Sequence, residues 1–401
     1  MTRHLWLMAA ALLLGIAPAD ARRKPVAPPP APPTDTLVEN VNGYTLDKAG
    51  TLVRFNGLLI DADGRVKALL KPGDRREPVK YRTDARGRTL LPGFIGLDGD
   101  VMEAGRLPPS PENERFRDNP VELEAVLTRA QERLAAAGIT TASDLGTTTA
   151  DWMLYRRFGD EGRLHIRISA IADGLGVLEQ VAPLRPTRWL YDGRLAMRAV
   201  TLTPEAQPGK APPGQMDARM RNLVSKALMV DAQPVLQAGS PAQGAVALDI
   251  YDEMLPTYGK DRRYRIAYAV APALADRPRL AAINGVATVQ PAAISRALLA
   301  DGVRTAISSD VGTDATAVFR GLAASISRPD GLFLQQAFAA VTSEAAFAIA
   351  AEDRLGTLEP GKWADFILVD RDIFVTPASE LPQTRVIETW VGGRRVFVAK
   401  P

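Results

Sequence analysis

Two aspartates, Asp98 and Asp100, are the side chains of this chain best placed to do chemistry. They follow the run Leu-Leu-Pro-Gly-Phe-Ile at 90–95 and are separated by Gly99. Because alternate residues of a strand face the same side, the spacing predicts that the two carboxylates share one face. Carboxylates at the end of a buried strand are costly unless they are paired, solvated or bound to a cation. The pair therefore marks a candidate catalytic or metal site, although Asp98-Gly99 is also typical of a plain turn.

The histidine and cysteine content argues against a zinc site. The chain has two histidines, His4 and His165, and no cysteine. Zinc sites need several nitrogen or sulfur ligands, which one histidine beyond the N-terminal region cannot supply. The lack of cysteine also excludes disulfides and thiolate nucleophiles. His165 stands in the apolar run 164–170, so we expect it to be a buried core residue.

Residues 1–21 have the pattern of a secretory signal peptide. Two basic residues precede an apolar run at 5–17, and Ala19-Asp20-Ala21 fits the rule for a cleavage site. The sequence predicts cleavage after Ala21 and export to a periplasm or the medium. An uncleaved membrane anchor is the alternative for this segment, and no other segment is apolar enough to span a bilayer. Residues 22–36 are rich in proline, which predicts an extended linker.

Size and charge restrict the class of partner. A chain of 401 residues with 46% hydrophobic content can bury a large core. Its formal net charge of +3 gives no indication of nucleic-acid binding. Size and charge therefore give no reason to expect a nucleic-acid or anionic-membrane partner.

Both ends of the chain predict β-structure. Short β-prone runs separated by glycine occupy 37–91, and similar runs occur at 366–370, 386–391 and 395–398. Asp63-Gly64 and Gly392-Gly393 each stand between two apolar runs, which predicts a tight hairpin at both places.

The middle of the chain alternates between helical and strand patterns. Apolar residues recur at helical spacing over 121–137, and Gly138 ends that pattern. Strands are predicted at 139–144, 164–170, 195–201, 234–237, 264–268, 285–289 and 305–309. Helices are predicted between several of them, at 215–230, 242–254, 291–300 and 315–327. Strands separated by helices favour an α/β fold with parallel βαβ units, and eight such strands favour a (β/α)8 barrel.

Two motifs carry a family resemblance. The turn Leu-Pro-Gly-Phe-Ile at 91–95 and the segment Leu-Gly-Thr-Leu-Glu-Pro-Gly-Lys-Trp-Ala-Asp-Phe at 355–366 resemble the amidohydrolase superfamily. Shorter stretches at 137–141, 189–194, 263–266, 289–291 and 301–310 resemble its amidohydrolase 3 branch. The resemblance implies a metal-dependent-hydrolase-like (β/α)8 TIM-type barrel at 92–352. It also implies a small β-sandwich built from 37–91 and 353–401.

The resemblance further implies where a metal site and its chemistry would lie. The family hydrolyses carbon–nitrogen bonds other than peptide bonds, with a metal held by histidines, a lysine and an aspartate. The first-strand histidine pair falls on Asp98 and Asp100, and the bridging lysine falls near Arg188. The later histidines fall on Gln237 and Tyr268, and the aspartate is retained as Asp310. An arginine cannot replace the lysine, because its guanidinium stays protonated.

Three functions remain open at this stage. A pseudoenzyme would keep the barrel and lose the metal. It would bind a small-molecule ligand or a partner in the barrel mouth, lined by Gln237, Tyr268 and Arg188, or it would have an assembly role. A hydrolase could instead use Asp98, Asp100 and Asp310 as oxygen ligands for Mg²⁺, Mn²⁺ or Ca²⁺. Metal-free catalysis would make Asp310 the base and the two other aspartates a coupled pair. The first function requires no cofactor, and none of the three uses zinc.

Overall fold

Two β-sheets organise the part of the chain that the computed structural model describes, namely residues 35–76, 78–108, 110, 119–203, 213–308 and 316–400. For residues 213–217 the description covers the backbone alone. The expected signal peptide at 1–21, nearly all of the expected linker and the candidate base Asp310 lie outside these ranges. Among the helices so described, none is long and apolar enough to cross a membrane.

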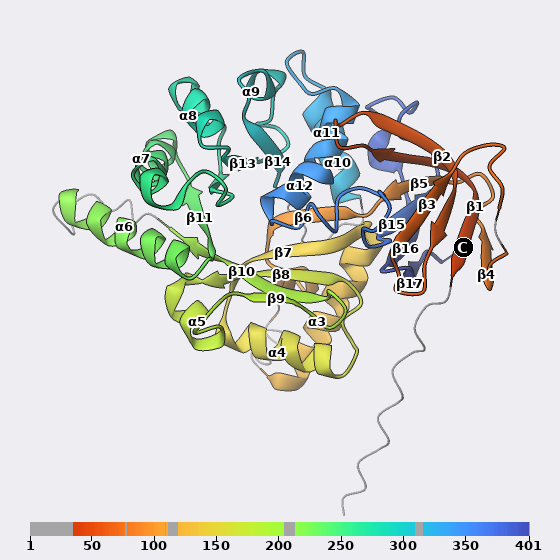
Figure 1. Ribbon diagram of the computed structural model, residues 1–401, viewed down its shortest axis with the longest axis horizontal. Coiled ribbons are helices and arrows are strands. Elements are labelled where there is room, and N and C mark those ends of the chain that lie inside the picture. The colour runs from red at the N-terminus through yellow and green to blue at the C-terminus, as the bar shows by residue number, and fades with distance from the viewer. Residues whose placement is uncertain are drawn as a thin grey trace, which may run out of the picture. The chain divides into compact units, whose positions relative to one another are not determined.

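The first sheet joins the two ends of the chain. Its order is β17-β16-β15-β5-β1-β2-β3, and β4 pairs with β1. The early strands are β1 (Thr36–Leu46), β2 (Leu52–Ile60), β3 (Val66–Leu70), β4 (Tyr81–Asp84) and β5 (Thr89–Pro92), and the late strands are β15 (Phe366–Val369), β16 (Val386–Val391) and β17 (Arg394–Val398). Figure 1 shows the red and orange early strands beside the blue late ones. The structure confirms that both chain ends build one β-unit, and it is a mixed sheet because β4 and β5 run parallel to β1.

Both predicted hairpins are present in this sheet. Asp63-Gly64 turns the chain between the antiparallel strands β2 and β3, and Gly392-Gly393 does so between β16 and β17. The β-prone runs at 37–91 were expected to be separated by glycine, but residues 52–60 form the single strand β2. Gly57 therefore lies inside a strand rather than between two strands.

The second sheet is the predicted parallel barrel. Its eight parallel strands are β6 (Phe94–Gly99), β7 (Ile139–Thr147), β8 (Arg167–Asp173), β10 (Leu195–Leu202), β11 (Gln233–Ala238), β12 (Arg265–Tyr268), β13 (Val286–Val289) and β14 (Arg304–Ile307). A parallel bridge between Leu97 and Ser308 brings the first and last of these strands together. One further strand, β9 (Thr187–Leu190), pairs antiparallel with the start of β10.

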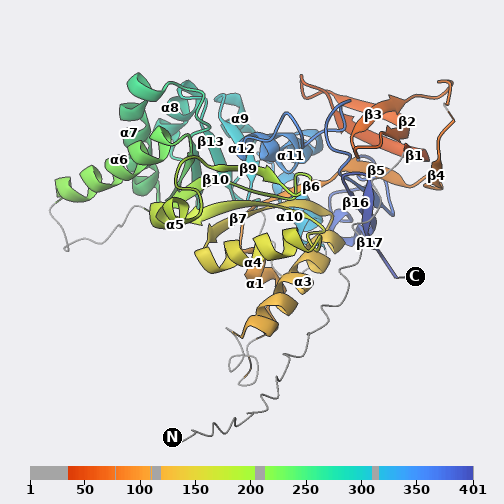
Figure 2. The same cartoon turned by 60° about the horizontal axis from the view of Figure 1, so that its bottom comes forward.

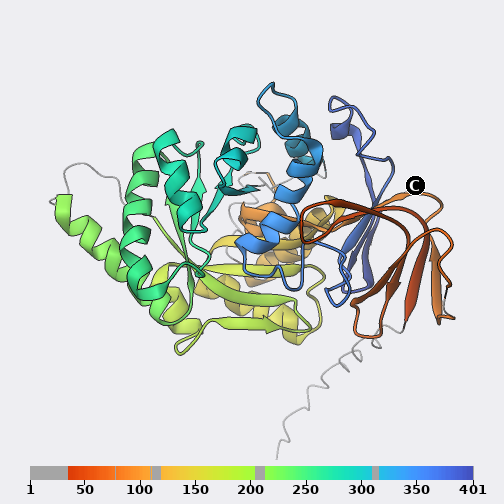
Figure 3. The same ribbon diagram turned by 45° about the horizontal axis from the view of Figure 1, so that its top comes forward.

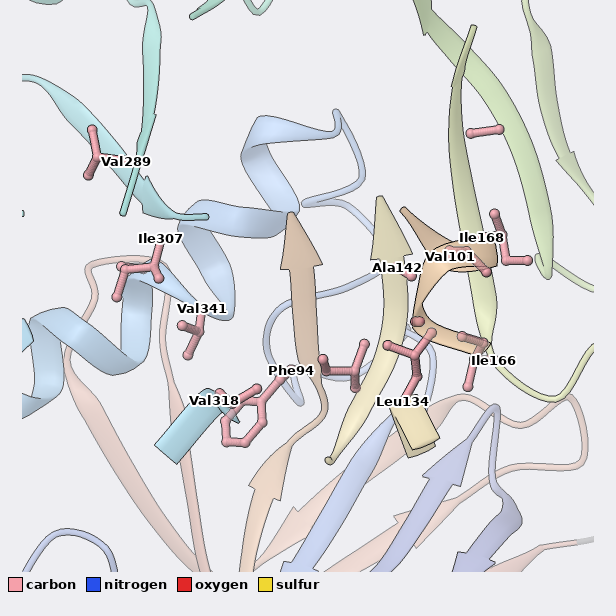
Figure 4. Close-up of a cluster of buried hydrophobic side chains, with 14 of the residues drawn as sticks. Phe94, Val101, Leu134, Ala142, Ile166, Ile168, Val289, Ile307, Val318 and Val341 are labelled. Atoms are coloured by element: carbon pink, nitrogen blue, oxygen red, sulfur yellow. The ribbon is translucent and has the colours of Figure 1, made fainter. Parts of the chain in front are cut away.

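Helices cover the outer side of the barrel strands (Figures 2 and 3). They are α1 (Val101–Gly105), α3 (Pro120–Ala136), α4 (Thr149–Asp160), α5 (Gly174–Val181), α6 (Pro213–Met229), α7 (Pro241–Tyr258), α8 (Arg277–Ala282), α9 (Arg296–Ala300), α10 (Ala317–Ile326), α11 (Leu334–Ala340) and α12 (Ser343–Ala348). The main apolar cluster lies between strands and helices, and Figure 4 shows part of it. In that cluster the ring of Phe94 on β6 meets Phe319 on α10 edge to face, at 5.5 Å between centroids.

His165 does not belong to this core. It lies just before β8, its side chain is exposed, and its backbone N–H donates to Gln131. The expectation of a buried histidine was wrong because β8 begins only at Arg167, three residues after the start of the apolar run at 164–170.

A buried ion pair joins the barrel to the terminal sheet. Arg167 on β8 donates from Nε and Nη2 to the two carboxylate oxygens of Asp365, at 2.7 and 2.8 Å. The side chains are only 1% and 4% exposed. The guanidinium also lies 3.8 Å from the ring centre of Trp363. Asp365 and Trp363 both belong to the segment 355–366, so this segment ties the last part of the chain to the barrel.

The turn at Gly193 also contributes to this contact between the barrel and the terminal sheet. Its carbonyl accepts a hydrogen bond of 2.7 Å from Arg167 Nη1. Its φ is +77°, and a Cβ added there would lie 2.3 Å from the Trp363 ring. Glycine is needed at this position for both reasons. The pair Asp192-Gly193 is typical of a turn, but nothing in the sequence indicates its contact with the closing segment.

We expect Arg167→Met to destabilise the protein by about 3–5 kcal/mol, because it leaves the Asp365 carboxylate buried without its cation. Urea unfolding followed by circular dichroism measures the change. Arg385→Met removes an exposed arginine that pairs with Asp370 and should cost less than about 1 kcal/mol. Equal losses in the two variants would contradict the role assigned to the buried pair.

Candidate functional site

Asp98 is the second-last residue of β6 and lies at the carboxyl edge of the barrel, where (β/α)8 proteins carry their functional residues. One of its oxygens, Oδ1, accepts a hydrogen bond from Nη2 of Arg265 on β12. The Asp98 side chain is 8% exposed and the Arg265 side chain is fully buried. The candidate site therefore contains a fixed cation supplied by the chain itself.

This ion pair is only partly satisfied. Asp98 Oδ2 and Arg265 Nε and Nη1 are buried and have no hydrogen-bond partner among the described residues. Buried charged atoms without partners are costly, so a polar molecule is expected beside them. In chemical terms the arrangement offers two guanidinium donors and one carboxylate acceptor.

Three hydroxyl groups extend this polar surface. Thr141 and Ser143 on β7 and Thr288 on β13 are buried, and their oxygens lack partners in the described part of the chain. Strand register places Thr288 beside Ala267, which packs against the interior cluster of Ile171, Ala199 and Val235. On β7, Leu145 joins the same cluster, and alternation places Thr141 and Ser143 on its side of the strand. The hydroxyls therefore face the barrel interior.

Asp100 does not pair with Asp98. It is exposed and caps α1 by accepting a hydrogen bond of 2.9 Å from the Glu103 backbone N–H. The expectation of a shared face assumed a regular strand, but Asp98 has a φ of +58°, in the left-handed region. This residue interrupts the alternation, and the two carboxylates have different surroundings.

Gln237 lies where the sequence placed it, near the carboxyl end of β11. It is half-buried, and its Nε2 donates to Oγ1 of Thr201 at 2.9 Å. Thr201 stands at the end of β10, so the two side chains form a polar contact between neighbouring strands at the same edge as Asp98.

Tyr268 faces the helices outside the barrel, not the barrel interior. It belongs to the main outer cluster, is 3% exposed, and lies against Gly244 of α7. Burial raises the pKa of its hydroxyl well above the usual range. The preceding residue, Ala267, faces the interior instead. This corrects the expectation that Tyr268 lines the barrel mouth.

Arg188 lies at the opposite end of the barrel. It belongs to β9, which runs antiparallel to the first residues of β10, and it is exposed. There it lines a pocket together with Arg198 and Arg263. Arg188 is therefore remote in the fold from the carboxyl edge, and the expectation that it replaces the bridging lysine of the mouth is corrected.

Asp310 stays a sequence-based candidate, since it lies outside the described residues. The chain just before it is placed: Ser308 is bridged to Leu97, the neighbour of Asp98.

The comparisons with known proteins agree with this architecture. The family model of the amidohydrolase family matches residues 101–397. The chain belongs to the amidohydrolase family. A search of the curated proteins found no match.

Several solved structures share the amidohydrolase fold with this chain. An uncharacterized metal-dependent hydrolase from Pyrococcus horikoshii OT3 has a TM-score of 0.69 at 17% identity, over 86% of this chain and 99% of that one. The guanine deaminase of E. coli has a TM-score of 0.67 at 17% identity, over 92% and 100%. The atrazine chlorohydrolase of Arthrobacter aurescens, solved with zinc, has a TM-score of 0.64 at 19% identity, over 90% and 95%. At these sequence identities, the similarity to the three structures shows a shared fold and nothing about substrate or metal.

The described residues of this amidohydrolase-family chain contain no group of three or more His, Cys, Asp or Glu side chains able to hold a metal ion. The expectations from the sequence did not pair Arg265 with Asp98. The available signal was an arginine inside the apolar strand pattern at 264–268, because a buried arginine requires a carboxylate partner.

Asp144, in the carboxyl-terminal half of β7, is a second buried carboxylate. The sequence did not indicate it as a candidate site residue. It accepts hydrogen bonds from the Val101 backbone N–H at 2.7 Å, Thr147 Oγ1 at 2.6 Å and the Tyr155 hydroxyl at 3.0 Å. Burial raises its pKa to about 6, and the nearby charge of Asp100 acts in the same direction. The hydrogen bonds only partly offset this rise in pKa, so Asp144 takes up a proton as the pH falls through about 6.

This pKa predicts a pH dependence of stability. A carboxyl whose pKa is raised in the folded state contributes stability below its unfolded pKa and loses it as pH rises through about 6. Between pH 7 and pH 5 we expect Asp144 to add about 1 kcal/mol to the free energy of unfolding. Urea unfolding at pH 5, 6 and 7 measures the slope.

Asp144→Asn should remove this contribution, because an amide has no proton to gain. Asp63→Asn, in the exposed turn between β2 and β3, should keep the wild-type slope. If Asp144→Asn retains the full slope, another group is responsible and the assignment fails.

Proposed function

We propose that this chain is an amidohydrolase-family barrel that binds a small polar molecule without a metal ion, as a pseudoenzyme. The observation that carries this proposal is the buried hydrogen-bonded pair of Asp98 and Arg265. By the family resemblance, Asp98 occupies a first-strand metal-ligand position, and Arg265 supplies a positive charge to it.

Electrostatics favours the guanidinium over a bound metal ion. Arginine stays protonated at all ordinary pH values. A divalent cation about 5 Å from it would be repelled by about 7 kcal/mol at an effective dielectric constant of about 20. Zinc has the further disadvantage that Gln237 and Tyr268 stand at the positions matched to histidine ligands, and Tyr268 packs under α7. These residues do not fit a zinc ion.

The unpartnered atoms indicate the chemistry of the ligand. Arg265 offers Nε–H and Nη1–H, and Thr141, Ser143 and Thr288 offer hydroxyls. A carboxylate or carbonyl oxygen would satisfy the arginine, and further polar groups would satisfy the hydroxyls. We therefore propose a small polar or anionic ligand in the barrel interior.

A hydrolase is the second candidate. Family membership supports it, and so does Asp98 Oδ2, a buried carboxylate oxygen with no partner in the described ranges. It would use Asp98 and Asp310 with Mg²⁺, Mn²⁺ or Ca²⁺, or would use Asp310 as a base without metal. Asp100 supports it less well, because that carboxylate is exposed and already caps α1. Export with cleavage after Ala21 is a separate proposal, based on the pattern of residues 1–21.

Metal content distinguishes the two candidates. We expect the wild-type protein, purified without chelator, to contain far less than one Mg, Mn, Ca or Zn per chain by elemental analysis. Near-stoichiometric metal that is lost in Asp98→Asn and Asp310→Asn, but kept in Asp63→Asn, would overturn the proposal and support the hydrolase. An assay with amide and cyclic amide substrates should be run on the same samples.

The ion pair can be tested independently of metal. Asp98→Asn and Arg265→Gln should each destabilise the protein by about 3–5 kcal/mol, because each leaves one buried charge uncompensated. The double variant should cost clearly less than the sum of the two, which a double-mutant cycle in urea reveals. Strict additivity would mean that the two side chains do not interact, and the argument from the fixed cation would fail.

A further inference from the structure

A pocket with a volume of about 610 Å³ lies at the amino-terminal ends of the barrel strands. Its wall includes β9, Gln233 at the start of β11, Arg263 just before β12, and residues 350–354 after α12. Asp98 and Gln237 stand at the carboxyl ends of their strands. The pocket shares no residue with the candidate site, although Arg263 of its wall is two residues from Arg265.

Arginine dominates the wall of the pocket. Its charged residues are the arginines Arg188, Arg198, Arg262, Arg263 and Arg354 and the carboxylates Asp231, Asp261, Glu352 and Asp353. Every one of these carboxylates is in an ion pair with an arginine of the same wall: Asp231 with Arg262, Asp261 and Glu352 with Arg263, and Asp353 with Arg354. Three of the five arginines are thereby neutralised.

Arg188 and Arg198 remain without a carboxylate among the described residues. Arg198 is half-buried and uses one nitrogen, Nη1, to donate to the Ala350 carbonyl at 2.8 Å. Arg188 is exposed, and neither a hydrogen bond nor an ion pair within the described ranges occupies its guanidinium. Five arginines and four carboxylates leave the wall with a net charge of +1. Within it, the guanidiniums of Arg188 and Arg198 have donors that are available to a ligand.

We propose that this pocket binds a small organic anion through Arg188 and Arg198. A guanidinium matches the two oxygens of a carboxylate or phosphate, and two guanidiniums facing one pocket favour an anion over a neutral molecule. The half-buried Trp189 adds apolar surface to the same wall and is held edge-on against Trp363, at 5.4 Å between ring centres. The ligand class is therefore a carboxylate or phosphate attached to an apolar or aromatic body.

This inference does not depend on the proposed pseudoenzyme function. The anion site uses residues of β9, β10 and the loop after α12, whereas the proposed interior site uses β6, β7, β12 and β13. Either can fail without the other.

Isothermal titration calorimetry of the purified protein tests the proposal, with inorganic phosphate and benzoate as probes in a low-salt buffer free of multivalent anions. We expect saturable binding of at least one probe at a single site. The relative affinities separate a phosphate-binding from a carboxylate-binding pocket. Benzamide, which has the same ring without the charge, should bind at least about tenfold more weakly than benzoate.

Substitutions of Arg188 and Arg198 test whether the probe binds in this pocket. Arg188→Gln combined with Arg198→Gln should weaken binding at least about tenfold, and Arg188→Lys should retain part of the affinity because it keeps the charge. The control Arg385→Gln removes an exposed arginine of the terminal sheet and should leave binding unchanged. No saturable binding of either probe, or equal binding in the double variant, would overturn the proposal.

A measurement on the wild type alone covers the case in which the double variant fails to fold. Phenylglyoxal modifies accessible arginines, and peptide mass spectrometry reads each position separately. The bound probe should protect Arg188 and Arg198 but not Arg385. Modification of Arg188 and Arg198 that is unaffected by a saturating probe would contradict the site.

Discussion

The Arg167–Asp365 ion pair is the contact on which the union of barrel and terminal sheet depends. Removing two charges from water is expensive, and the cost is recovered only when geometry and additional hydrogen bonds are good. Here both conditions hold, because the contact is bidentate, Gly193 and Asp192 accept from Nη1, and the Gly392 N–H donates to Asp365 at 2.7 Å. Trp363 covers the guanidinium, so water is excluded from a fully satisfied network.

The second buried pair, Asp98 with Arg265, has a different character. It joins the carboxyl-terminal part of β6 to the first residue of β12, and it leaves one carboxylate oxygen and two guanidinium nitrogens without described partners. A half-satisfied polar network destabilises a protein core, so such a network is retained where another molecule completes it. The contrast between the two pairs separates a structural contact from a candidate binding site without reference to any relative.

Most of the fold could be predicted from the sequence, because its signals are local. Alternating helix and strand patterns indicated the barrel, and both glycine hairpins were found as expected. The site was harder to predict, because each error concerned the direction of a single side chain. A left-handed residue at Asp98 separated it from Asp100, and Tyr268 faces the helices while Ala267 faces the interior. The ion pair between Asp98 and Arg265 joins residues far apart in the chain, which no local pattern reports.

The placement of β15 between β5 and β16 has a consequence for biosynthesis. Strand β5 pairs with β15, so the first sheet cannot close until the ribosome has released the last part of the chain. Until then the N-terminal strands have an unpaired edge, and Arg167 lacks its carboxylate. Such non-local pairing slows folding and exposes strand edges to aggregation. A nascent or truncated chain of this protein should therefore depend on chaperones until its C-terminal strands arrive.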